Sequence, residues 1–268
     1  MVKVLILGST GMMGSAVGKY FLEQKDYQTI LSYRNEKISY GENKFWFDAL
    51  ESEISDLPRV DYIINCIGVI KPFIEEDRYK SIFINSLFPY KLASYCKDRN
   101  TRLIHITTDC VFSGVEGDYM ESSLHDCEDF YGKTKSLGEP SNCMMLRTSI
   151  IGEEIHQNVS LVEWAKLMKG KTINGFTNHY WNGMTTKQYA KICDQIIRKE
   201  LYSDGVHHVY SNPVNKFELL NLISEKFKLH LNINEYQTEN DCNRILNSER
   251  DLINNLNVDS IEQQIQDL

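Results

Sequence analysis

The run Val2-Lys3-Val4-Leu5-Ile6-Leu7-Gly8-Ser9-Thr10-Gly11-Met12-Met13-Gly14 decides the fold of this chain. Its apolar first half predicts a buried strand, and three glycines spaced by three residues follow at once. Such a turn uses glycine where φ is positive, where the backbone approaches a pyrophosphate and where a helix packs on a strand. The helix that follows would turn its free N–H groups toward the anion. We predict a phosphate-binding turn formed by Gly8, Thr10, Gly11, Met12, Met13 and Gly14.

Apolar runs and helical stretches alternate through the first 150 residues. This pattern is typical of a parallel sheet with helices on both faces. It predicts strands at Val2–Leu7, Gln28–Ser32, Tyr62–Asn65, Arg102–Thr107 and Cys143–Arg147. It predicts helices at Met12–Gln24, Asn85–Arg99 and Phe130–Gly138. We expect an α/β fold with a Rossmann-type, doubly wound parallel sheet.

The alternation breaks down between Gly152 and Gly183, which indicates a smaller lobe. We expect an NADP-binding Rossmann domain over residues 1–150 and a mainly substrate-binding lobe over 151–268. The stretch 186–210 is expected to return to the sheet, and a helix is expected at Lys216–Phe227.

Composition excludes several classes of function. The net charge of −8 argues against a nucleic-acid or anionic-membrane surface, because both need a basic face. No apolar run reaches the about 18 residues that would span a bilayer. Seven scattered cysteines with no CxxC pair indicate reduced thiols and, with no signal-peptide pattern, a cytoplasmic protein. The histidines show no ligand spacing, so no metal site is expected.

The end of the second strand selects the cofactor. Arg34 stands where an arginine favours the 2′-phosphate of NADP over the free 2′-hydroxyl of NAD. Glu36 is close enough in sequence to take the opposite role, and that alternative stays open. The GxxGxxG spacing of the turn resembles the extended short-chain dehydrogenase/reductase family. By that resemblance, the remaining cofactor contacts fall on Asp48, Ala49, Cys66, Ile67 and Gly68.

A YxxxK pair, Tyr131 and Lys135, supplies the expected acid–base chemistry. Residues four apart lie on one helix face, so the ammonium can stabilise the phenolate of a tyrosine whose ordinary pKa is about 10. A hydroxyl at the carboxyl end of a parallel strand points into the ligand crevice, and Thr108 would there hydrogen-bond a substrate carbonyl. Thr107 is the second candidate for that role, and it is also counted among the cofactor contacts.

The segments TTDCVFSG at 107–114 and YGKTKSLGE at 131–139 resemble the dTDP-4-dehydrorhamnose reductase family. The resemblance also covers Leu146–Gly152, Trp181–Thr186 and, weakly, the region of Arg244. It implies catalytic roles for Thr108, Tyr131 and Lys135. It implies substrate contacts from Cys110, Val111, Phe112 and Trp181.

The resemblance implies NADPH-dependent reduction of the C4 ketone of a UDP- or dTDP-linked 4-keto-6-deoxy sugar, for deoxysugar and glycan biosynthesis. The nucleotide, the C2 substituent (an acetamido group included) and the product stereochemistry stay open, and so does a homodimer. A 4,6-dehydratase is disfavoured, because Cys110 stands where those relatives place an acid after Asp109. A non-catalytic regulatory subunit, like that of methionine adenosyltransferase, is a third hypothesis.

Cys110 carries one further alternative. Rhamnose-forming reductases resemble one another in having tyrosine at this place, whereas some bifunctional 3,5-epimerase/4-reductases have cysteine. A thiolate could exchange the acidic protons beside the ketone. A free thiol with a pKa of about 8.5 is mostly protonated at neutral pH, and a simple pocket-shaping role is the competing interpretation.

Overall fold

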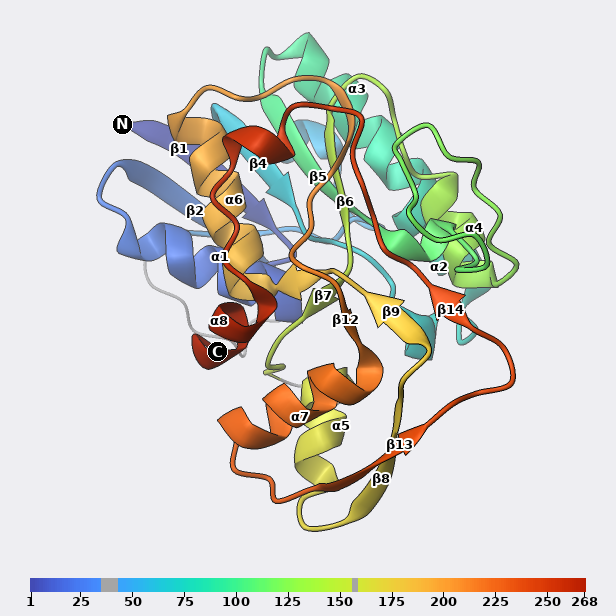
Figure 1. Cartoon of the computed structure of the whole chain (residues 1–268). Coiled ribbons are helices and arrows are strands. Elements are labelled where there is room, and N and C mark those ends of the chain that lie inside the picture. Colours follow the sequence, from blue (N-terminus) through green and yellow to red (C-terminus); the bar gives the residue numbers. More distant parts are fainter. Residues whose placement is uncertain (35–42, 156–158) are drawn as a thin grey trace.

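The computed structural model describes residues 1–34, 43–155 and 159–268. Seven strands form the central sheet: β1 (Val2–Leu7), β2 (Tyr27–Tyr33), β3 (Lys44–Trp46), β4 (Tyr62–Asn65), β5 (Arg102–Thr108), β6 (Met144–Thr148) and β11 (Gly205–His208). They lie in the order β11-β6-β5-β4-β1-β2-β3, and every neighbouring pair is parallel (Figure 1). The predicted α/β fold with a Rossmann-type parallel sheet is confirmed.

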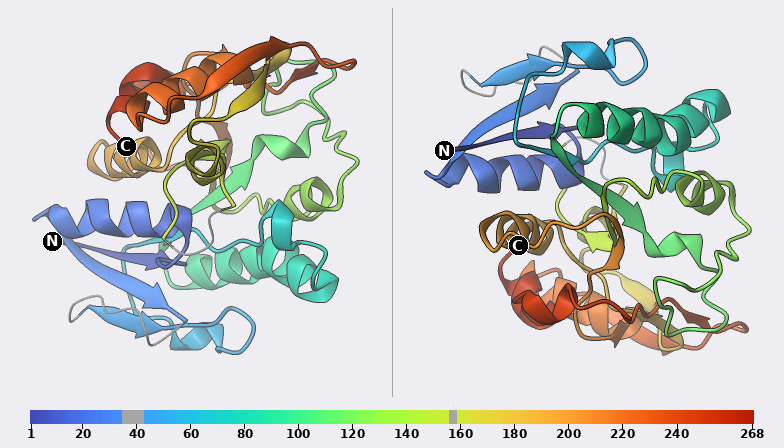
Figure 2. Two further views of the ribbon diagram at one scale, coloured as in Figure 1. Left: turned by 90° about the horizontal axis from the view of Figure 1, so that it is seen from below. Right: turned by 90° about the horizontal axis from the view of Figure 1, so that it is seen from above.

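Helices cover both faces of the sheet (Figure 2). On one face α1 (Met12–Glu23) packs with α6 (Thr186–Arg198), and on the other lies α3 (Phe88–Asp98). Val4 and Ile6 of β1 enter the first core, while Leu5 and Leu7 enter the second. Alternate side chains of one strand therefore fill two cores, which explains why the four residues Val4–Leu7 are all apolar.

The predicted helix Asn85–Arg99 is wrong at its start. The chain forms α2 (Arg78–Ile82), then one wide π-helical turn (Phe83–Leu87), and only then α3. Pro89 lies in the first turn of α3 and has no N–H to donate to Asn85, four residues earlier. The widened turn accommodates that missing hydrogen bond.

Strand bounds differ from the predictions by at most one residue for β2, β5 and β6, and not at all for β1 and β4. Strand β3 was not predicted, because Lys44–Trp46 is only three residues long. β11 extends the sheet beside β6. The predicted helices at 12–24, 130–138 and 216–227 correspond to α1, α4 (Phe130–Ser136) and α7 (Lys216–Lys226), each slightly shorter.

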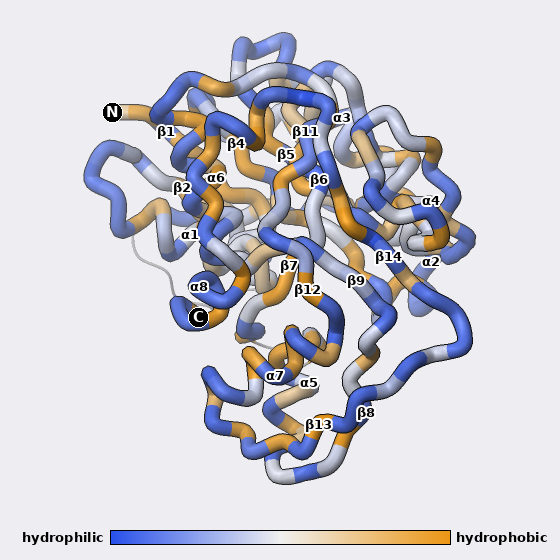
Figure 3. Tube along the Cα trace, in the orientation of Figure 1, coloured by the Kyte–Doolittle hydropathy of each residue, from blue (hydrophilic) through white to orange (hydrophobic). Residues whose placement is uncertain are grey.

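The second lobe lies below the sheet in Figure 1. Its elements are β7 (Ile150–Ile151), α5 (Leu161–Leu167), β8 (Thr172–Phe176), β9 (His179–Trp181), β10 (Met184–Thr185), β12 (Val214–Asn215), α7, β13 (Asn232–Tyr236), β14 (Cys242–Asn243) and α8 (Ile261–Gln266). Short 3-10 turns occur at Ile54–Asp56, Lys71–Phe73, Asp109–Val111 and Ile253–Asn255. A separate apolar core holds this lobe together, and the connection from β13 to β14 is hydrophilic (Figure 3).

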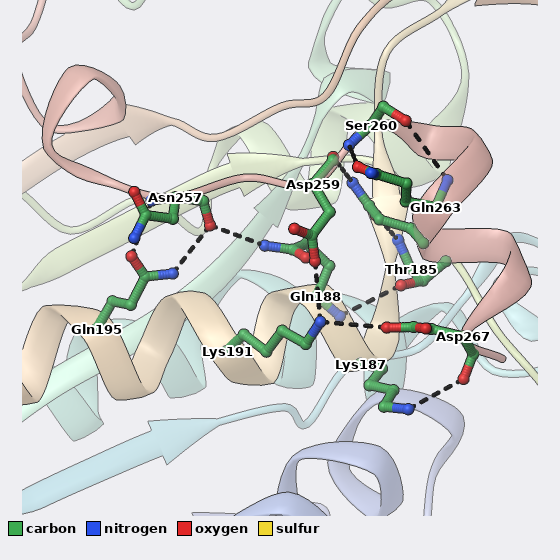
Figure 4. A network of polar contacts seen from close by, with 11 residues as sticks. Thr185, Lys187, Gln188, Lys191, Gln195, Asn257, Asp259, Ser260, Gln263 and Asp267 are labelled. Atoms are coloured by element: carbon green, nitrogen blue, oxygen red, sulfur yellow. Dashed lines mark hydrogen bonds and ion pairs between the residues drawn. The ribbon is translucent and has the colours of Figure 1, made fainter.

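The C-terminal segment is fastened to α6 by polar contacts (Figure 4). The Gln264 Oε1 atom accepts a hydrogen bond of 2.8 Å from the backbone of Thr185, just before α6 begins. Lys191 pairs with Asp259 at 2.9 Å and with Asp267 at 3.3 Å. The tail thus supports the helix that packs against α1. No helix in the described ranges has the length and apolar character needed to cross a bilayer.

Candidate active site

The glycine turn between β1 and α1 has the backbone that a bound phosphate requires. Gly8 has φ +76°, and a Cβ there would lie 3.0 Å from Ile67. A Cβ on Gly14 would lie 2.1 Å from the Gly8 carbonyl oxygen, so only glycine fits. No side chain caps α1 at Gly11, and its first turn carries no acid. The N–H groups of that turn are therefore free for an anion.

The other residues predicted in this turn differ in exposure. Thr10 and Met12 are half-buried at the turn, and Gly11 is exposed. The Met13 side chain is buried in the core under α1. A contact from Met13 to a ligand would therefore come from its backbone.

Arg34 and Asp48 meet at the carboxyl edge of β2 and β3. The Arg34 Nε atom lies 3.8 Å from the Asp48 carboxylate, and the Arg34 side chain is 60% exposed. Ala49 is buried beside Asp48. The guanidinium is thus held at the edge of the site with its donors accessible. Glu36, the alternative selector, lies outside the described residues.

The loop after β4 is fixed by two buried amides. Asn65 accepts a 3.1 Å hydrogen bond from the backbone of Ile67 and contacts His105 Nδ1 at 2.9 Å. Asn85 bonds both the N–H and the carbonyl of Val69 at 2.9 Å. These contacts hold the half-buried Cys66 and Ile67 and the exposed Gly68 against the glycine turn. Burial raises the pKa of the Cys66 thiol to about 12, which makes it inert.

Thr108, Tyr131 and Lys135 come together at the carboxyl end of β5. Asp129 caps α4 by accepting a 2.8 Å hydrogen bond from Gly132, and the helix then presents Tyr131 and Lys135 on one face. Burial raises the pKa of Tyr131, while a hydrogen bond to the Thr108 hydroxyl opposes that rise.

Lys135 is 6% exposed, and its Nζ donates to the Ile106 carbonyl at 3.2 Å. Burial lowers its pKa to about 8, and the Glu139 carboxylate opposes this shift. An ammonium, a phenol and a hydroxyl thus converge in a largely desolvated site, which is the arrangement that proton transfer to a carbonyl oxygen needs.

Cationic side chains from three segments lie near Cys110, and one of them, Lys71, also lies over Tyr131. The Lys71 Nζ lies 5.8 Å from the Tyr131 ring and 3.0 Å from Asp129. Arg244 donates to the Phe112 and Ser113 carbonyls at 3.1 and 3.3 Å and reaches Cys110 Sγ at 3.7 Å.

Lys216, at the start of α7, lies 5.1 Å from the Trp181 ring. Within the described residues, neither Lys216 nor Arg244 forms an ion pair closer than 4.0 Å. Lys216 and Arg244 thus lie near Cys110 with the buried Asp109 carboxylate as a nearby opposite charge, and neither is held in a close ion pair.

Cys110 is half-buried beside this cluster. Burial and the neighbouring Asp109 carboxylate raise the pKa of its thiol to about 12, although Arg244 and Lys71 act in the opposite direction. The thiol is thus a neutral group at physiological pH.

The side chains of three predicted substrate residues are enclosed. Val111 and Phe112 are fully buried, and Phe112 stacks on Tyr119 with ring centroids 4.1 Å apart. Trp181 is 3% exposed in the core of the second lobe. Their contact with a sugar stays a prediction.

Thr107 is buried, and its hydroxyl donates to Glu139 at 2.6 Å. It is therefore turned toward the end of α4.

Among the described residues, no three His, Cys, Asp or Glu side chains are grouped to hold a metal ion.

Several residues of the site were not assigned a role from the sequence. Lys71, Lys216 and Asn85 belong to no motif that was recognised as functional, and Arg244 was seen only as part of a weak match. Glu139 was seen only as the last residue of the segment at 131–139, and its place four residues after Lys135 is a signal that could have revealed its role.

Comparison with known proteins gives one family and several relatives. The family model described as "RmlD substrate binding domain" matches residues 2–263. Methionine adenosyltransferase 2 subunit beta of Xenopus tropicalis is 25% identical over 85% of this chain and 72% of its own length. The dTDP-4-keto-6-deoxy-D-glucose reductase of Streptomyces niveus is 35% identical over 32% of this chain and 31% of its own. The fold is shared with a Bacillus anthracis dTDP-4-dehydrorhamnose reductase solved in complex with NADP, at TM-score 0.77 and 19% identity over 99% of this chain and 98% of that one.

Proposed function

Because this chain belongs to the RmlD substrate binding domain family and carries motifs of the dTDP-4-dehydrorhamnose reductase type, we propose that it is an NADPH-dependent reductase of 4-keto nucleotide sugars. The observation that carries the proposal is the assembly of Thr108, Tyr131 and Lys135 at the same carboxyl edge of the sheet as a glycine turn that fits a pyrophosphate. The proposed division into an NADP-binding domain over 1–150, joined by 186–210, and a substrate lobe over the rest of 151–268 belongs to the same proposal.

The residues present fit NADPH. The turn of Gly8, Gly11 and Gly14 would hold its pyrophosphate, and Arg34 would bind the 2′-phosphate through charge-assisted hydrogen bonds. Asp48 and the loop Cys66–Gly68 would line the adenosine and ribose. When bound, NADPH would supply the hydride that reduces the ketone.

The chain's own side chains supply the proton and the orientation. The Thr108 hydroxyl, which donates to the Asp109 carboxyl at 3.2 Å in the free protein, would donate instead to the C4 carbonyl and hold it in place. Tyr131 would donate its phenolic proton to the carbonyl oxygen as negative charge develops there. The Lys135 ammonium would stabilise the resulting phenolate and bind a ribose hydroxyl.

The cations beside Cys110 support a nucleotide sugar as the substrate. Arg244 is anchored by two carbonyls, and Lys216 is shielded on one side by Trp181. Both side chains would offset the negative charge of a bound diphosphate. Without them, a protein of net charge −8 would repel this group. Cys110, Val111, Phe112 and Trp181 are proposed to shape the sugar pocket.

A binding panel tests this proposal. Calorimetric titration of the NADPH-loaded protein with UDP, dTDP and 4-keto-6-deoxy sugars on each nucleotide should give saturable binding for at least one nucleotide. Arg244→Met should weaken that binding about tenfold or more, as loss of a charge-assisted contact predicts. A protein that binds no nucleotide sugar, but captures a methionine adenosyltransferase catalytic subunit, would support the regulatory-subunit hypothesis instead.

A further inference from the structure

We propose that Thr107 and Glu139 form a tether that fixes the catalytic helix α4 against strand β5, and that both are positioning residues for the reaction. The inference rests on the proposed function and extends it to two residues outside the Thr–Tyr–Lys set. It also gives Thr107 a role different from the cofactor contact expected from its sequence position.

Two successive residues of β5 are bonded to Lys135 near the end of the catalytic helix and to Glu139, three residues beyond it. The Ile106 carbonyl accepts from Lys135 Nζ at 3.2 Å, and the Thr107 hydroxyl donates to Glu139 at 2.6 Å. The next strand residue is Thr108. The strand is therefore bonded at two adjacent residues to α4 and to the chain that leaves it, so a shift of α4 along β5 would strain these bonds. The tether thus sets the approach of Tyr131 to Thr108.

The Glu139 carboxylate is itself held firmly. Its side chain is 7% exposed, and Arg147 donates to its two oxygens at 2.6 and 3.3 Å. Gly138 leads the chain to this position so close to the π-helical turn that a Cβ would lie 1.8 Å from the Asn85 oxygen. A buried carboxylate that accepts two hydrogen bonds from one guanidinium is a rigid acceptor, so it fixes the direction in which the Thr107 hydroxyl points.

Arg147 is fixed in turn by two histidines. Its guanidinium, which only donates, reaches Nε2 of His125 at 2.8 Å and Nε2 of His208 at 2.9 Å. Both histidines are therefore neutral, with their protons on Nδ1 directed at Ser136 and at the Asn247 carbonyl. The tether is anchored in α4, β6, β11 and the tail at once.

Glu139 also acts on Lys135 through its charge. The groups that face the Lys135 ammonium are Glu139, neutral His105 from β5, the Ile106 carbonyl and, from α4 itself, the neutral phenol of Tyr131. Glu139 is the acid among them. The hydroxyl tether and the carboxylate charge can therefore be separated by different substitutions.

Thr107→Val tests the tether, because it removes the hydroxyl, keeps the shape and leaves the Glu139–Arg147 pair intact. We expect kcat to fall about tenfold, since a displacement of about 1 Å at a reacting group costs up to about 100-fold. KM for the sugar should change by less than about twofold, and Thr107→Ser should restore kcat. Thr29→Val is the matched control: Thr29 is equally buried, and its hydroxyl bonds the Phe21 carbonyl at 3.1 Å, away from the site.

Glu139→Gln tests the charge, because the amide oxygen can still accept from Thr107. The alkaline limb of the kcat/KM profile should move to lower pH in this variant and stay in place in Thr107→Val. The tether is refuted if Thr107→Val keeps wild-type kcat, or if Thr29→Val loses as much activity.

Hydrogen exchange separates this inference from the proposed function. If the wild type reduces no 4-keto sugar, the function fails, but the tether still predicts faster amide exchange over 130–136 in Thr107→Val than in wild type or Thr29→Val. Equal exchange in all three proteins would refute the tether as well.

Discussion

Burial decides the chemistry of single residues around Thr108. Desolvation lowers the pKa of Lys135 to about 8 and raises that of Tyr131 and of Cys110, so in the free protein the phenol and the thiol are neutral. A neutral phenol is the form that can give a proton to a ketone. A neutral thiol, by contrast, cannot remove one from carbon.

Cys110 should therefore not act as an epimerase base. In deuterated water without NADPH, a 4-keto-6-deoxy nucleotide sugar should take up deuterium at C3 and C5 no faster with the protein than without it. Nuclear magnetic resonance of the recovered sugar measures this. Enzyme-dependent deuterium that disappears in Cys110→Ala would instead establish the bifunctional epimerase and reductase.

Arg34 should select NADPH over NADH. A guanidinium bonded to a 2′-phosphate contributes about 1.5–3 kcal/mol, so Arg34→Ala should reduce the ratio of the two affinities by about tenfold or more. Fluorescence titration of each cofactor gives both dissociation constants. Arg59→Ala, which changes an exposed arginine before β4 at the opposite edge of the sheet, should leave the ratio unchanged. An unaltered ratio in Arg34→Ala would mean that Arg34 does not set the cofactor preference and would favour Glu36 as the selector.

At the level of elements, the turn between β1 and α1 has no room for a side chain. Gly14→Ala would place a methyl group 2.1 Å from the Gly8 oxygen, and backbone atoms on both sides must then move. We expect NADPH binding to be lost and the free energy of unfolding to fall by roughly 1–3 kcal/mol. Gly11→Ala is the control for stability, because its Cβ would make an ordinary 3.6 Å contact with the same oxygen. Equal denaturation midpoints for the two variants would contradict this account of the turn.

The sequence predicts those elements whose pattern is local. β1 and β4 are mostly apolar runs with the predicted bounds, and Tyr131 and Lys135 are recognisable by their spacing together with the segment at 107–114 that precedes them. β3 exists because three residues pair with β2, and the π-helical turn exists because Pro89 cannot donate a hydrogen bond. Neither cause is visible as a hydrophobic period.

The partners of the site were hidden for a similar reason. Lys216 and Arg244 approach Cys110 from more than 100 residues away, brought there by the fold of the second lobe. The role of Glu139 depends on its hydrogen bonds to Thr107 of β5 and Arg147 of β6, which the fold brings next to it. Contacts of this kind are set by tertiary structure and leave no spacing in the sequence.

For the whole molecule, buried neutral histidines link stability to pH. Burial and Arg147 lower the pKa of His208 from 6.5 to about 4. The unfolded chain then binds a proton between these values that the folded chain does not, so stability is full above pH 6.5 and is lost as the pH falls toward 4. The loss from this residue is of the order of 3 kcal/mol.

His208→Gln should flatten this dependence. Glutamine can still accept from Arg147 and donate to the Asn247 carbonyl, but it does not titrate. Urea denaturation at pH 7, 6 and 5 should show a smaller fall in the free energy of unfolding for the variant than for the wild type. If the free energy of unfolding fell equally with pH in both proteins, the pKa of His208 would have to be the same in the folded and the unfolded chain.

The central claim is that Tyr131 gives the proton in the reduction of a 4-keto nucleotide sugar. The most direct measurement is single-turnover oxidation of NADPH, mixed with excess 4-keto-6-deoxy nucleotide sugar, in wild type and Tyr131→Phe. We predict reduction at C4 by the wild type and a rate at least about 100-fold lower in the variant, with the NADPH dissociation constant unchanged within about twofold. A Tyr131→Phe protein that turns over at the wild-type rate, or a wild type that oxidises no NADPH with any 4-keto nucleotide sugar, would contradict the account.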